Sequence, residues 1–101
     1  METYIAVMTM TAKGMDEIHL IPGFVQGFAR NLEKSGGKFR GFWKTMGEID
    51  YVSVFDATDG NHALTAIMAL GKTGYFSTTT LKAYSMDEMT ASLERYSEKF
   101  T

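Results

Sequence analysis

The sequence holds two histidines, and imidazole is the side chain best suited to acid–base chemistry or metal binding near neutral pH. His62 falls in the first turn of a predicted helix, where the helix dipole favours a neutral ring that could act as a base or a ligand. A surface polar residue at a helix start is the simpler interpretation of His62. His19 lies in a predicted connection before Pro22, where it could contact a ligand but more simply occupies the surface.

Two carboxylates and a run of hydroxyls offer further polar chemistry. Glu48 and Asp50 are two residues apart, so both side chains could project from one face of a strand. Catalytic use would need a pocket that raises the pKa of one of them. The preferred interpretation is that Asp50 accepts backbone N–H groups and stabilises a turn. Later in the chain, Thr78 and Thr80 could orient a polar group of a ligand if they face a cavity.

Several classes of site and partner are excluded by what the sequence lacks. There is no cysteine, which removes disulfides, thiolate nucleophiles and zinc–cysteine sites. No His-x-x-x-His or Glu-x-x-His spacing occurs, so we expect no metal and no resident cofactor, although a single axial haem histidine stays compatible with the sequence. The formal net charge of −2 predicts no nucleic-acid partner. No apolar run reaches the roughly 18 residues of a membrane span. The chain begins without a basic signal segment, so we expect a cytoplasmic protein with no membrane partner.

The apolar pattern predicts the elements that must position these groups. Alternation predicts strands over 4–10, 38–46, 51–57 and 75–84, and helical periodicity predicts helices over 22–35, over 60–70 and from 86 onward. Asp59 is the predicted N-cap of the second helix, and Ser85 with Glu88 forms a capping box at the third. Residues 1–101 therefore form one α+β domain. Its order is ferredoxin-like βαββαβ with a C-terminal helix, and helices cover one face of an antiparallel sheet.

Large apolar residues are numerous, because the chain has 8 Met, 7 Phe, 5 Tyr and 1 Trp. Strand parity separates two apolar sets, and we assign the β-branched set, which includes Ile5 and Val52, to the helix-covered side. The other set then lies on the uncovered face, where such a patch needs a cover, and a second copy is the simplest one. A dry dimer core and a pocket between the two sheets are both compatible with this arrangement. The predicted pocket wall consists of Tyr4, Met8, Trp43, Tyr51 and Phe55, with Thr80 and His62 as polar contacts.

Three segments of the chain resemble the GYD domain family. They are Tyr-Ile-Ala-Val-Met at 4–8, Thr-Met-Gly-Glu-Ile-Asp at 45–50, and Ser-Thr-Thr-Thr-Leu-Lys-Ala-Tyr at 77–84. Gly47 and Asp50 match the motif that names the family, whereas Ile49 stands where the family has a tyrosine. Any role of that phenol hydroxyl is therefore in doubt in this chain unless Tyr51 supplies it.

The resemblance implies a fold and a range of functions. The family is similar to the dimeric α/β-barrel superfamily, in which two ferredoxin-like protomers pack sheet to sheet. That superfamily includes cofactor-independent oxygenases, isomerases, haem-handling enzymes and regulatory ligand-binding modules, and fold alone does not decide among them.

We therefore expect a small homodimeric α/β-barrel protein that binds a small, mostly apolar or aromatic molecule between its sheets. A cofactor-independent oxygenase or isomerase is the enzymatic form of this expectation, and His62, Asp50 and Glu48 are its candidate catalytic residues. The alternative is a non-catalytic assembly or regulatory module, whose Met and aromatic sheet face serves only oligomerisation.

Overall fold

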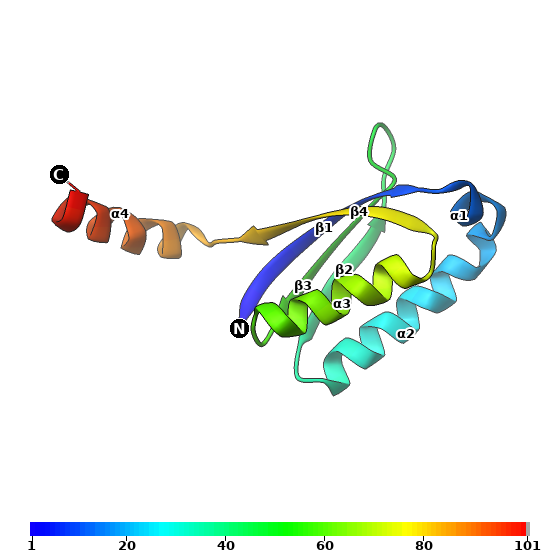
Figure 1. The fold of residues 1–101 in the computed structure, drawn as a ribbon, viewed down its shortest axis with the longest axis horizontal. Helices are drawn as coiled ribbons and strands as arrows, with labels where there is room; N and C mark the ends of the chain where they lie inside the picture. Colours follow the sequence, from blue (N-terminus) through cyan, green and yellow to red (C-terminus); the bar gives the residue numbers. More distant parts are fainter. Residues whose placement is uncertain (101) are drawn as a thin grey trace.

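The protein is an α+β domain with a four-stranded antiparallel sheet, seen in a computed structural model that describes residues 1–100. The strand order is β2-β3-β1-β4, and α2 and α3 lie together on one face of the sheet (Figure 1). This arrangement confirms the predicted ferredoxin-like βαββαβ plan with a C-terminal helix. The elements are β1 (Glu2–Met10), α1 (Ala12–Asp16), the 3-10 turn η1 (Ile18–Leu20), α2 (Ile21–Lys34), β2 (Lys38–Lys44), β3 (Tyr51–Ala57), α3 (Gly60–Lys72), β4 (Phe76–Ala83) and α4 (Met86–Phe100).

Local capping interactions explain where the helices begin. The Asp59 side chain accepts a hydrogen bond from the His62 N–H at 2.9 Å and so caps α3, as the sequence predicts. At α4 the Glu88 N–H donates to Ser85 Oγ at 3.0 Å, and the Ser85 N–H donates to Glu88 Oε1 at 2.9 Å. This reciprocal pair confirms the predicted capping box.

The assignment of the two sheet faces from strand parity was wrong. Tyr4 and Met8 on β1 lie opposite Phe55 and Tyr51 on β3, and all four are buried in one cluster with residues of α2 and α3. The β-branched set lies on the opposite side of the sheet, which none of the helices within residues 1–100 covers (Figure 1). The physical reason is side-chain size, because rings and long thioether chains fill the layer between a sheet and two helices better than short branched chains do.

Aromatic side chains contact one another along the length of this core. The Phe55 ring stacks on Tyr4 with centroids 5.9 Å apart and meets Phe28 of α2 edge to face at 6.0 Å. Toward the other end of the sheet, Tyr51 meets Phe76 edge to face at 5.4 Å. Such pairs add to the free energy already gained by burying the rings. Much of the surplus of large apolar residues is therefore the core of the subunit.

A β-bulge in β2 changes which residues share a face. Phe39 lies opposite Phe55 and Gly41 lies opposite Val54, which leaves Arg40 as the extra residue. Beyond the bulge, Trp43 lies opposite Val52 and therefore sits on the side of the sheet that lacks helices. A bulge of this kind reverses the alternation of the strand that contains it.

The C-terminal helix stands apart from the domain. After β4 ends, α4 projects away from the sheet and from both packed helices (Figure 1), and none of the residues Met86–Phe100 is buried. Across residues 1–100, no helix is both long enough and apolar enough to cross a bilayer.

Truncating Phe55 to alanine tests which sheet face forms the core. Phe55 is 0% exposed, so we expect Phe55→Ala to lower the free energy of unfolding by about 3–5 kcal/mol through lost burial and a new cavity. Leu64→Ala is the matched control, because Leu64 on α3 is 58% exposed and its loss should cost about 0.5 kcal/mol or less. Urea unfolding measures both, and equal effects would contradict the assigned core.

Candidate functional site

The structure separates the residues predicted to line one pocket. Tyr4, Met8, Tyr51 and Phe55 lie beneath the helices, so they cannot line a space between the sheets of two copies. Trp43 is 51% exposed on the other side of the sheet. The polar candidate Thr80 lies opposite Ala6 on the edge strand β4, where it is exposed.

The other predicted polar candidate, His62, lies in a groove between α2 and α3. This inter-helix groove encloses about 380 Å3 and is mostly apolar. The His62 Nδ1 accepts a hydrogen bond from the Thr58 N–H at 3.0 Å, so the proton of the neutral ring sits on Nε2. Nε2 is 2.7 Å from Ser35 Oγ, and the Ser35 hydroxyl donates in turn to the Leu32 carbonyl at 2.9 Å.

This tautomer decides what the Ser35–His62 pair does in the structure. An activated serine would donate a hydrogen bond to an imidazole nitrogen, whereas the Ser35 oxygen here accepts a hydrogen bond from the ring N–H. Both ring nitrogens are occupied by hydrogen bonds, and the one to Ser35 connects the end of α2 to the start of α3. The pair therefore acts as a connection between helices in this arrangement.

A second hollow lies where η1 and α2 begin and where β2 and β3 meet the hairpin. This sheet-end hollow encloses about 450 Å3, and two of its lining residues, Lys44 and Tyr51, carry polar groups. Tyr51 is the one residue of the predicted wall that contributes to it. The remaining lining is apolar and consists of Ile18, Ile21, Pro22, Val25 and Phe42.

Tyr51 is a buried residue of the sheet-end hollow that carries a hydroxyl group. Its nearest hydrogen-bond acceptor is Met10 Sδ at 3.7 Å, and a thioether is a weak acceptor. Burial, and then the negative charge of Asp50, raise the pKa of Tyr51 above its usual value. The phenol is therefore protonated at neutral pH and can donate a hydrogen bond.

Lys44 places the one positive charge of the lining beside this phenol. Its Nζ lies 4.9 Å from the centroid of the Tyr51 ring, an arrangement that favours a cation over the ring face. The ammonium also donates to the Thr45 and Asp50 carbonyls at 3.1 and 3.3 Å, while the nearest carboxylate oxygen, on Asp50, is 3.7 Å away. Lys44 is thus held over the hollow while half of its side chain stays in solvent.

The hairpin that bears the family motif has a structural role. Asp50 Oδ2 accepts a hydrogen bond from the Met10 N–H at 2.7 Å, and the Asp50 N–H donates to the Met8 carbonyl at 2.9 Å. The Asp50 carboxylate therefore accepts one backbone N–H, as predicted, but Met8 and Met10 both lie on β1, so these bonds tie the hairpin to β1 instead of closing a local turn. Glu48 is exposed at the tip of the hairpin and His19 is exposed in η1. Within residues 1–100, no three His, Asp or Glu side chains gather closely enough to hold a metal ion.

The open face is the side of the sheet opposite the helices, and it carries an ion pair that the sequence analysis missed. Arg40 Nη2 lies 2.9 Å from Asp56 Oδ2, and the Thr3 hydroxyl donates to Asp56 Oδ1 at 2.7 Å. The hydrogen bonds from Arg40 are the largest cause of a pKa of Asp56 below its usual value, and the bond from Thr3 adds to them. Strand register and the bulge at Arg40 bring these residues together, so spacing along the chain gives no signal of the pair.

The Asp56 carboxylate predicts a specific acid sensitivity. Because its pKa is lower in the folded state than in the unfolded chain, its contribution is complete above the unfolded value of about 3.9 and is lost as pH falls through the folded value. We expect Asp56→Asn to be less stable than the parent at neutral pH and to lose less stability than the parent on acidification. Urea unfolding over a pH series measures this, with Asp87→Asn on the exposed α4 as control. Parallel pH profiles for Asp56→Asn and the parent would contradict the assignment.

Comparison with known proteins places this geometry in a family. The model of the GYD domain matches residues 4–93. No curated protein and no solved structure matches the chain. The matched region runs from β1 into α4 and includes the hairpin with Gly47 and Asp50, so the resemblance seen in the sequence is confirmed. The chain therefore belongs to the GYD domain family.

Proposed function

We propose that this protein binds a small, mostly apolar or aromatic molecule that carries an acidic group, and that it does so in the sheet-end hollow. The observation that carries the proposal is that Lys44 and the buried Tyr51 line one apolar hollow, with the Lys44 ammonium 4.9 Å from the centroid of the Tyr51 ring. Its volume of about 450 Å3 lies within the range of small-molecule sites, which combine an apolar lining with a few polar groups.

The polar groups of Tyr51 and Lys44 are the proposed contacts of the acidic end of the ligand. The Tyr51 hydroxyl donates to the Met10 sulfur atom, so a carboxylate or phenolate oxygen would be a stronger acceptor than its present partner. Lys44 has two carbonyl partners and a carboxylate at 3.7 Å, so a bound anion would gain a charge-assisted hydrogen bond there. The apolar body of the ligand would meet Ile21, Val25 and Phe42.

This proposal moves the ligand from between two sheets to between the sheet and its own helices. Tyr51 belongs to both versions of the site, and Lys44 replaces Thr80 and His62 as the polar contact. The proposal concerns binding, and an oxygenase or isomerase activity stays a prediction from the resemblance.

We also propose that the open face packs on a second copy. This keeps the predicted homodimer, but its interface is formed by the β-branched set of residues instead of the aromatic set. In the subunit this face holds the partly exposed Ile5, Val7, Val52 and Val54, flanked by exposed Trp43 and Leu81. A contiguous apolar sheet face of this kind marks an interaction surface, and a twofold pair of identical faces is its commonest solution. This observation favours the assembly module as the second candidate function.

A matched pair of probes tests the ligand site. We expect 1-naphthoate to bind and Lys44→Gln to weaken it about tenfold, because the ammonium contributes a charge-assisted contact. Binding of the neutral 1-naphthamide should change little in the same variant. Calorimetric titration measures both affinities, with Lys72→Gln at the exposed end of α3 as control.

Two results would contradict the ligand proposal. One is equal weakening of both probes by Lys44→Gln. The other is unchanged 1-naphthoate binding by Val25→Trp, a variant in which the larger ring fills the sheet-end hollow and should abolish binding.

Light scattering tests the sheet-face dimer. The parent should show twice the subunit mass of 11.3 kDa, and Val52→Asp should shift it toward a monomer because a charge would be buried without a partner. Leu64→Asp introduces the same charge at an exposed position of α3 and should leave the mass unchanged. A parent that is monomeric at micromolar concentration would refute the dimer.

A further inference from the structure

The large apolar residues of α4 form a narrow stripe with heptad spacing. Met86, Met89, Leu93, Tyr96 and Phe100 follow one another at intervals of three, four, three and four residues. These side chains are between 49% and 74% exposed. Such a stripe, two positions wide in every seven, is the seam of a helix that packs against one other helix. We call these five residues the α4 seam.

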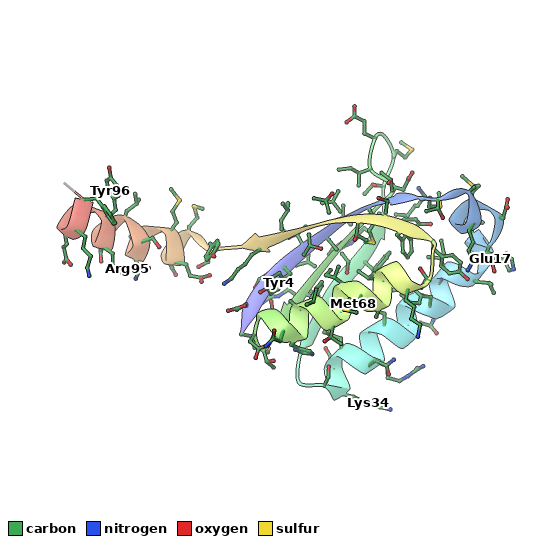
Figure 2. The ribbon with its side chains drawn as sticks, in the orientation of Figure 1. Tyr4, Glu17, Lys34, Met68, Arg95 and Tyr96 are labelled. Carbon is green, nitrogen blue, oxygen red and sulfur yellow. The ribbon has the colours of Figure 1, made fainter. Side chains whose placement is uncertain are left out.

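The charges of α4 avoid the borders of the seam. In the heptad the positions that flank the seam are Thr90, Ser92, Ser97 and Lys99, of which only Lys99 is charged. The outward positions carry the other charges of the helix, on Asp87, Glu88, Glu94, Arg95 and Glu98. Figure 2 shows this division, because Tyr96 and Arg95 extend from opposite sides of α4.

We propose that α4 pairs through this seam with α4 of a second copy. Two identical helices repel each other when like charges line their contact, and the nearly neutral borders of the α4 seam avoid that repulsion. A helix that packs on a sheet or in a groove between two helices needs a wider apolar face than the seam provides. The projection of α4 away from α2 and α3 leaves the seam open to another molecule (Figure 1).

The length of α4 indicates how this pairing contributes to assembly. A helix of 15 residues is only marginally stable on its own in water. The pairing of two α4 helices therefore depends on the rest of the chain, to which α4 is attached, for part of its stability. Tyr96 and Phe100 stack on each other with ring centroids 5.6 Å apart, so they form one continuous apolar surface at the end of the seam. The pairing does not depend on a ligand in the sheet-end hollow.

The absence of cysteine from the chain allows a clean cross-linking test with all 101 residues present. Leu93 lies at the middle of α4, so two paired helices bring its two copies together in either orientation. We expect mild oxidation to produce several-fold more covalent dimer from Leu93→Cys than from Glu94→Cys, which points outward, because a disulfide needs Cα atoms within about 7 Å. Equal yields would overturn the proposal.

Two further variants distinguish the seam from other contacts of α4. Adding Tyr96→Glu to Leu93→Cys places a charge in the seam and should reduce the cross-link to the level of Glu94→Cys. A mixture of Leu93→Cys with Ala69→Cys tests the inter-helix groove of a second copy as the alternative partner. If the mixed disulfide dominated in that sample, α4 would lie in the groove and the proposed pairing would be wrong.

Discussion

The packing of aromatic side chains between the sheet and its two helices is the constraint on which the rest of the structure depends. Phe55 lies between Tyr4 and Phe28 with centroids 5.9 and 6.0 Å away, and it is completely buried. Once this strand parity faces the helices, the opposite parity must form the open face. The same choice turns Tyr51 toward the start of α2, where it lines the sheet-end hollow.

The structure therefore assigns two different roles to the large apolar residues, which their number in the sequence does not distinguish. The rings on the helix-covered face stabilise the subunit, whereas the aliphatic open face and the α4 seam are apolar surfaces that the described subunit leaves uncovered. Both surfaces suit contacts between copies of the chain, but they differ in shape and chemistry. The sheet-end hollow is a third apolar feature and the one in which Lys44 supplies a charge.

Strand parity failed as a guide to the faces for a physical reason. Both parities of β1 and β3 are apolar, so alternation identifies two sets without saying which of them meets the helices. The decision rests on the volume between sheet and helices, which Phe28 and Leu32 of α2 share with Phe55. The bulge at Arg40 then reverses the alternation of β2, which no local pattern predicts.

By itself the sequence determined the order of the elements, the caps at Asp59 and Ser85 and the family. These features depend on short-range hydrogen bonds and on motifs that lie within a few residues. Only the tertiary structure decided which face is buried, that Lys44 and Tyr51 share a hollow, and that Arg40 pairs with Asp56. Those results depend on contacts between distant segments, as between Thr3 and Asp56, which lie 53 residues apart. The packing of the whole domain sets such contacts, and no single segment encodes them.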